Sequence, residues 1–308
     1  MTVRKGVTDV RWWILAALIA AFVIGDTGHA PVIAMVTLMV MMCVSLHGLT
    51  FSKTDITGKK KELLLGIAIC YGAATGVTLI VGSFYDSALW AGWVMIAAVP
   101  CAVSVTTGTL ILKGDTKTAM VITAVIYVMA LALTPLITHI LIGESVSPLD
   151  VLRYVALFIA IPLIVSVPLR KVSVNADLKS VSINIMFFIL VFITFGANKE
   201  FILNEPKTVL WVAAGCIVRI FAVAAAAELI LRRIRMSRDS RIPMVLLSIW
   251  KNSALAMSLT MILIETETSV LPSALSLPLE MVCFMIMIWY YQKRYEAEVR
   301  PAEEGTAV

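Results

Sequence analysis

The chain has 308 residues, of which 60% are hydrophobic and 15% charged, and its mean hydropathy is +0.95. About half of the residues of a soluble globular domain are apolar, so this composition excludes an ordinary soluble domain and predicts an all-α polytopic membrane protein. The formal net charge of +5 reflects the placement of basic residues around membrane spans, so no nucleic-acid partner is expected.

Ten apolar runs follow one another along the chain, and each is predicted to form one transmembrane helix. About 20 apolar residues in a helix cross the hydrocarbon core of a bilayer. The runs are 12–25, 30–51, 63–84, 88–112, 118–142, 149–169, 180–197, 207–231, 243–264 and 269–291. The first run is short and follows basic residues, so a signal peptide with Gly28-His29-Ala30 as a loose cleavage site is its alternative interpretation.

The basic residues alternate between the two ends of these runs. If the N-terminus is inside, 20 of the 25 Lys and Arg residues lie in inner segments, and three, Arg153, Lys199 and Lys207, lie in outer ones. An excess of Lys and Arg marks cytoplasmic loops. A missing or additional helix would destroy this alternation. The sequence therefore predicts a multi-pass protein of the plasma membrane, with ten spans and both termini in the cytoplasm.

Ten spans divide into two sets of five. We expect two inverted repeats, residues 1–143 and 144–292, followed by a cytoplasmic tail over 293–308. An odd number of spans in each half places the halves in opposite orientations, as in many secondary transporters. The longest polar stretch is the tail, so residues 1–308 are predicted to form a single transport unit without a soluble domain.

The fourth span of each half carries polar or helix-breaking residues in its middle. These are Pro100 and Ser104 in the first half and Ser248 and Ser253 in the second. Non-helical backbone at membrane depth is tolerated only where it is buried in protein or lines a cavity. Two interrupted spans at matching positions predict broken, crossing helices four and nine at a central substrate site. Ordinary proline kinks and Ser/Thr bonding within the helix are the alternative.

Three ionisable residues are predicted near the middle of the bilayer: Arg219, Lys251 and Glu280. Each costs about 2.5–3.5 kcal/mol at the centre of a span if it is unpaired. We expect Glu280 to pair with Arg219 or Lys251, which leaves one cationic group for an anionic solute. For Arg219 and Glu280, a closed structural network is the alternative.

No motif for enzymatic chemistry is visible. The sequence contains no nucleotide-binding loop, catalytic triad or metal-ligand spacing, and its five cysteines lie in apolar runs without a CxxC pair. They are interpreted as small apolar residues. The protein is therefore predicted to be no enzyme and to need no cofactor or metal.

Several stretches resemble the bile acid:sodium symporter family. Pro100, Gly114-Asp115, Thr123 and Thr134-Pro135 align without a gap with the fourth and fifth helices of that family, and MVMMCVSLHGLTFS at 39–52 resembles its second. WKNSALAMSL, beginning at Trp250, resembles its ninth. The resemblance implies a ten-helix carrier that imports organic anions with two sodium ions by alternating access. Helices 3–5 and 8–10 would form a core, and helices 1, 2, 6 and 7 a separate panel.

The resemblance also implies where sodium ligands would lie, and most of them are replaced. One family site uses a Ser-Asn pair, a Ser, a Thr and a Glu; the matching residues here are Val105-Thr106, Ala119, Thr123 and Leu247. The second site uses that Glu and one Gln each on helices three and nine. Lys251 stands at the helix-nine Gln, and the third span has no glutamine. We therefore expect the Lys251 ammonium to replace a bound ion.

These observations predict a secondary transporter of a small organic anion. Its site would be lined by Thr106, Thr123, Lys251 and Asn252, with Arg219 and Glu280 in supporting ion pairs. Desolvation favours the neutral form of a lysine, so Lys251 could release a proton in each cycle. Transport would then be proton-coupled or independent of sodium, which leaves H⁺ or Na⁺ as the coupling cation.

Three alternatives remain open at this point. The first is a conventional sodium:organic anion symporter with substituted ligands and backbone carbonyls. The second is an arsenite-type efflux carrier, because Pro100-Cys101 resembles the Pro-Cys pair in the same helix of that family, although its acidic residue on helix nine is absent. The third is a non-transporting membrane receptor or scaffold, against which the lack of a sizeable soluble domain argues.

Overall fold

The computed structural model describes residues 10–28, 30–46, 59–143, 146–169, 175–264 and 266–304, and within them all of the named elements are helical. This confirms the all-α prediction, and each of the ten predicted runs contains at least one helix. In the described residues five helical stretches are long and apolar enough to cross a membrane, and shorter apolar helices accompany them. The five stretches are Lys60–Gly82, Thr116–Ile142, Asp177–Ala197, Pro206–Arg233 and Thr268–Tyr291.

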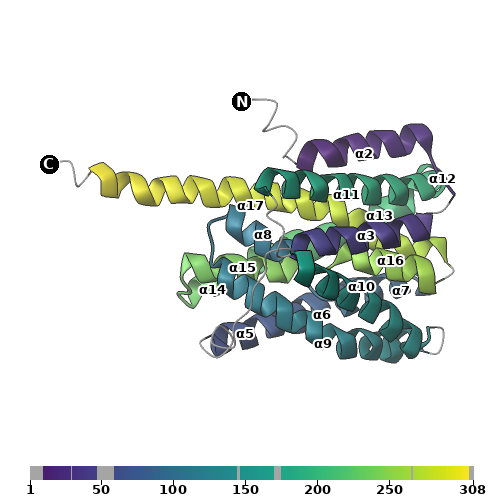
Figure 1. Ribbon diagram of the computed structural model, residues 1–308, viewed down its shortest axis with the longest axis horizontal. Helices are drawn as coiled ribbons and strands as arrows, with labels where there is room; N and C mark the ends of the chain where they lie inside the picture. Colours follow the sequence, from purple (N-terminus) through teal and green to yellow (C-terminus); the bar gives the residue numbers. More distant parts are fainter. Residues whose placement is uncertain are drawn as a thin grey trace.

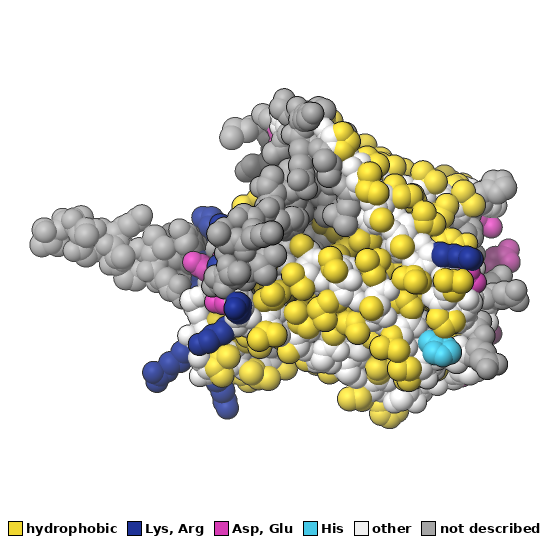
Figure 2. All heavy atoms as spheres, turned by 60° about the horizontal axis from the view of Figure 1, so that its bottom comes forward, with side chains coloured by type: hydrophobic (Ala, Val, Ile, Leu, Met, Phe, Trp, Pro, Cys, Tyr) yellow, Lys and Arg dark blue, Asp and Glu magenta, His cyan; other side chains and the backbone are white. Residues whose placement is uncertain are grey.

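The surface is consistent with a membrane setting. Large apolar side chains are widely exposed, among them Val23 at 74%, Phe84 at 72% and Leu210 at 70%. Contiguous exposed apolar surface of this extent is unfavourable in water. Figure 2 shows hydrophobic side chains across the middle of one face, with most of its Lys and Arg side chains at the left-hand end, where Figure 1 places α5, α14 and α15.

Four helices form a group along one side of the molecule. They are α2 (Val10–Ile24), α3 (Ala30–Leu46), α10 (Pro148–Leu169) and α11 (Ala176–Ala197). Helix α11 packs against both α2 and α3, and α3 also packs against α10, as Figure 1 shows for α2, α11 and α3 in its upper part. The short α12 (Lys199–Asn204) connects α11 to the next span.

The third and eighth predicted spans each contain a π-helical segment in their middle. The third consists of α5 (Lys60–Ile67), η1 (Ala68–Ala74) and α6 (Thr75–Gly82). The eighth consists of α13 (Pro206–Ile217), η3 (Val218–Ala222) and α14 (Val223–Arg233). π-Helical segments are rare, and they often occur at functional sites. They widen the helix and leave backbone groups that can bind other partners.

The fourth and ninth predicted spans are each divided into two helices. The fourth consists of α7 (Ser87–Ala98) and α8 (Ser104–Ile111), and the ninth of α15 (Arg238–Ile249) and α16 (Ser253–Leu263). Both interruptions fall where the polar and helix-breaking residues occur in the sequence. Pro100 lies in the first break, and Ser104 and Ser253 are the first residues of the helices that follow the breaks.

Two long helices complete the fold, α9 (Thr116–Ile142) and α17 (Leu271–Glu304), the latter preceded by the 3-10 turn η4 (Glu267–Val270). Helix α17 continues well beyond the predicted start of the tail at residue 293. The sequence there, QKRYEAEVRPAEE, is rich in Gln, Lys, Arg, Glu and Ala. These residues favour helix without being apolar, so hydrophobicity alone placed the end of this helix too early.

Gly92 on α7 permits a close approach between α7 and η4. A Cβ atom at this position would lie 2.0 Å from the backbone oxygen of Ser269, and backbone cannot move aside as a flexible side chain can. We expect Gly92→Ala to lower the melting temperature markedly in detergent. Gly76→Ala on α6 is the matched control, because nothing lies within 4 Å of its Cβ position, and alanine favours helix over glycine. Equal melting temperatures of the two variants would contradict the close approach.

Candidate functional site

The two helix breaks meet at one point in the interior. Cys101 and Lys251 form an isolated antiparallel bridge. Ala102 N donates to Trp250 O at 2.9 Å, and Asn252 N donates to Pro100 O at 2.8 Å. Each break therefore supplies hydrogen-bond partners to backbone groups of the other, which makes non-helical backbone acceptable at this depth.

Neighbouring helices supply donors to the carbonyl ends of the half-helices. At the end of α7, Ala97 O accepts a bond from Thr75 Oγ1 at 2.8 Å, and Ala98 O accepts one from Thr134 Oγ1 at 2.9 Å. At the end of α15, Ile249 O accepts a bond from Arg219 Nη1 at 3.3 Å. The last carbonyls of a helix have no partner within it. These side chains therefore stabilise the interruptions.

Lys251 is fully buried, and its ammonium group contacts the third span. Its Nζ lies 3.1 Å from Thr75 Oγ1 and 3.4 Å from Cys70 O, and 4.7 Å from the ring centroid of Tyr71. Among the described residues no carboxylate pairs with it. A carbonyl oxygen, a hydroxyl oxygen and a ring face are all groups that stabilise a cation. The π-helical η1 contributes two of these three residues.

Arg219 and Glu280 form a closed pair beside the ninth span. Arg219 Nη2 lies 2.5 Å from Glu280 Oε1, and both residues are 2% exposed. The same carboxylate oxygen accepts a bond from Ser253 Oγ at 2.8 Å. Arg219 and Lys251 were the two partners expected for Glu280, and in the structure its partner is Arg219. Because Arg219 also binds Ile249 O, the pair connects η3 and α17 to both sides of the ninth-span break.

The remaining predicted residues lie around the crossing. Asn252 caps α16 through Leu255 N, and its Nδ2 donates to Tyr127 OH at 3.0 Å. Thr123 Oγ1 lies 3.9 Å from Cys101 Sγ. The hydroxyl of Thr106 is buried without a hydrogen-bond partner in the described part of the chain. Ser248 donates within its own helix, to Val245 O.

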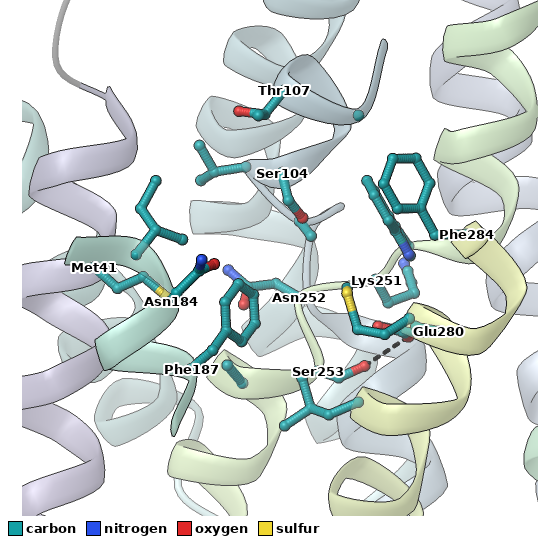
Figure 3. Close-up of a pocket in the computed structure, with 18 of the residues that line it drawn as sticks. Met41, Ser104, Thr107, Asn184, Phe187, Lys251, Asn252, Ser253, Glu280 and Phe284 are labelled. Atoms are coloured by element: carbon teal, nitrogen blue, oxygen red, sulfur yellow. Dashed lines mark hydrogen bonds between the residues drawn. The ribbon is translucent and has the colours of Figure 1, made fainter. Parts of the chain in front are cut away.

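A cavity of about 180 Å³ adjoins the crossing. It lies between the starts of α8 and α16 on one side and α3, α11 and α17 on the others (Figure 3). Polar lining residues include Ser104, Thr107, Ser180, Asn184, Asn252, Ser253 and Glu280, and apolar ones include Met41, Phe187, Trp250 and Phe284. Lys251 contributes to the wall, but none of the three residues that its ammonium contacts lines the cavity.

Sequence reasoning did not identify Thr75, Cys70, Tyr71 or Tyr127 as part of this region. Thr75 alone carries a signal, since it is a hydroxyl residue in a span that is otherwise mainly apolar. Sequence reasoning also did not identify Asn184 and Phe187, which α11 contributes to the lining of the cavity.

Three of the five residues at the position of the first family sodium site are apolar in this chain, and only Thr106 and Thr123 carry hydroxyl groups. Val105, Ala119 and Leu247 have no exposed surface and belong to the hydrophobic core. Sodium requires several hard oxygen ligands, and aliphatic side chains supply none. In the described residues no group of three His, Cys, Asp or Glu side chains is placed to hold a metal ion.

Comparison with known families gives a match. A family model described as Sodium Bile acid symporter family matches residues 32–205, which is more than half of the chain. The match includes the first broken span and ends before the helices that carry Arg219, Lys251 and Glu280. No curated protein matches the sequence.

Proposed function

This chain belongs to the sodium bile acid symporter family and is a membrane transporter, and from this premise we propose that it carries a small organic anion by alternating access without a bound sodium ion. The observation that carries the proposal is the position of Lys251. The second sodium site of the family is shared by helices three and nine, and the Lys251 ammonium lies between the corresponding spans. The tethered cation replaces the dissociable one.

The charge balance supports this substitution. Two sodium ions and one helix-nine glutamate give the family's occupied core a net charge of +1. Here Leu247 replaces the glutamate and Lys251 adds one positive charge, while Arg219 and Glu280 neutralise each other. The core therefore keeps a net charge of +1 without bound ions, and a monovalent anion neutralises it.

The cavity beside the crossing is the proposed solute site. The N-termini of α8 and α16 begin at its wall, and the N-terminus of a helix carries a partial positive charge with free N–H groups. Ser104, Asn252 and Ser253 supply polar contacts there. A volume of about 180 Å³ is below the roughly 300–1,000 Å³ of drug-sized ligand sites, which favours a compact anion over a steroid.

We propose that the protein has ten spans in two inverted repeats, residues 1–143 and 144–292. Two similarities between the halves support this architecture. The third span of each half contains a π-helical segment, and the fourth span of each half is broken. In each half a side chain in or directly after the π-helical segment, Thr75 or Arg219, binds a carbonyl at the end of the first half-helix.

The moving parts follow from the packing. We propose α2, α3, α10 and α11 as the panel, and the two broken spans with their neighbours as the core, with the cavity at the boundary between them. Thr106 and Thr123 lie at the first family sodium site, away from the cavity lining. Both termini would be cytoplasmic and the protein would lie in the plasma membrane.

The test is thermal-shift screening of the purified protein against small organic anions, with and without sodium, at two pH values. We expect at least one compact carboxylate to raise the melting temperature equally in sodium and in potassium buffer. Stabilisation only in sodium would support a conventional sodium symporter instead. If the hit is then transported into proteoliposomes with full dependence on sodium and none on a pH gradient, the tethered-cation proposal fails.

A further inference from the structure

A second pocket opens between α14 and α17, near the end of the molecule where α14 and α15 lie. Its volume is about 430 Å³, and its walls are largely apolar. Ala224 and Ala225 of α14 are small and leave room for the pocket on one side, and Ile286 and Met287 of α17 line the other wall. Ile286 and Trp289 at the rim are 51% and 63% exposed. The pocket therefore belongs to the apolar surface that faces a bilayer.

Glu228 and Arg232, the charged residues that line this pocket, do not pair with each other. The spacing of Glu228 and Arg232 is that of an i,i+4 helix pair. Instead, Glu228 Oε2 binds Arg241 Nε at 3.0 Å and Tyr291 Oη at 2.5 Å. Arg232 lines the pocket, is exposed, and has no ion-pair partner among the described residues. The pocket thus joins an apolar slot to an available guanidinium group.

We propose that this pocket binds one anionic phospholipid, with an acyl chain between α14 and α17 and its phosphate on Arg232. An arginine guanidinium matches the geometry of a phosphate through two parallel hydrogen bonds. The carboxylate nearest to the phosphate, Glu228, is already neutralised by Arg241, so it offers little repulsion. The apolar walls exclude a free phosphate as the occupant, because a phosphate ion has no apolar surface to bury against them, whereas a hydrocarbon chain does.

The bound lipid would contact the half-helix that leads to Lys251. Val245 of α15 lines the pocket, and the Glu228–Arg241 pair connects α14 to α15. Tyr291 connects the same carboxylate to α17. The lipid therefore stabilises the packing of three helices around the ninth-span break, and its site requires no transported solute.

The test uses the purified full-length protein, native mass spectrometry and thermal shift. Dioleoyl phosphatidylglycerol is compared with dioleoyl phosphatidylcholine, which has the same chains, and with soluble glycerol 3-phosphate, which has none. We expect the wild type to retain phosphatidylglycerol about fivefold over phosphatidylcholine, the effect of one basic residue at a membrane surface. Glycerol 3-phosphate should not change the melting temperature.

Three variants separate the parts of the proposed site. Arg232→Gln should remove the preference, and Arg233→Gln, an exposed neighbour outside the pocket lining, should keep it. Ala225→Leu should reduce retention of both lipids by filling the slot without a change of charge. The proposal is overturned if Arg232→Gln and Arg233→Gln behave alike, if Ala225→Leu retains lipid as the wild type does, or if glycerol 3-phosphate stabilises as well as the lipid.

Discussion

Replacing Lys251 with methionine is expected to abolish anion transport and, at the same time, to make the protein more stable. The ammonium group is buried without a carboxylate partner among the described residues, and an unpaired charge at membrane depth costs about 2.5–3.5 kcal/mol. Methionine has a similar length and no charge, so this cost disappears. The solute anion loses the positive charge that balances it. Because the ammonium group contacts Thr75 on the third span, which does not line the cavity, this charge acts at a distance, and its loss should weaken binding about 10-fold, as for two charges roughly 10 Å apart in a protein interior.

Opposite changes in stability and activity distinguish a functional lysine from a structural one. The melting temperature is measured in detergent, and affinity is measured for the anion found by thermal-shift screening. Lys251→Arg keeps the positive charge and should keep part of the affinity, while Lys207→Met removes an exposed lysine and should change neither quantity. If Lys251→Met lowers the melting temperature and leaves the affinity for the anion unchanged, the ammonium group has a structural role only.

Much of the fold could be predicted because hydrophobicity and helix length report directly on the bilayer. The predicted run 118–142 corresponds to α9 at Thr116–Ile142, and 149–169 corresponds to α10 at Pro148–Leu169. The two interruptions were predictable as well, since Pro100 and the polar stretch after Ser248 are costly in a continuous apolar helix. Local residue chemistry decides both features, so sequence alone suffices for them.

The partners of Lys251 and Glu228 could not be predicted in the same way, although Arg219 was one of the two partners expected for Glu280. Lys251 contacts Thr75, which is 176 positions away in the chain. The family resemblance implies that the third and ninth spans meet, but it does not indicate which residue of the third span contacts the ammonium group. Glu228 shows that local spacing is also a poor guide. Arg232 lies at the i,i+4 position from it, which favours an ion pair on a helix, but Arg241 at the start of α15 binds the carboxylate instead. Tertiary packing brings α15 against α14, and this contact outweighs the weak preference of an exposed i,i+4 pair.

The π-helical segment η1 explains why the contribution of the third span to the site was not predicted. Residues 68–74 read AICYGAA, an apolar stretch that predicts a regular transmembrane helix. In the structure η1 brings Cys70 O and the Tyr71 ring to the ammonium group of Lys251. The two groups that η1 supplies to the buried cation are thus a backbone oxygen and an aromatic face, and neither is recognisable as a ligand from residue type.

Removing the carboxylate of Glu280 is expected to be among the most destabilising single changes in the protein. Glu280→Gln leaves Arg219 buried without its counter-charge and weakens the connection of η3 and α17 to the ninth-span break. Loss of one partner from a buried ion pair costs about 3–5 kcal/mol. We expect a fall of roughly 10 °C in the melting temperature, measured in detergent by thermal shift.

A double variant that removes both charges shows whether this loss comes from the unpaired charge. Arg219→Met combined with Glu280→Leu removes both charges, and replacing a buried pair by apolar residues of similar volume is often neutral. The double variant should therefore be more stable than either single variant, despite the lost bond to Ile249 O. The exposed pair of Arg153 and Asp150, 3.1 Å apart, is the matched control, since Asp150→Asn should cost less than about 1 kcal/mol. A double variant less stable than Glu280→Gln would mean that the hydrogen bonds of Arg219 to the break, and not its charge balance with Glu280, hold the ninth span in place.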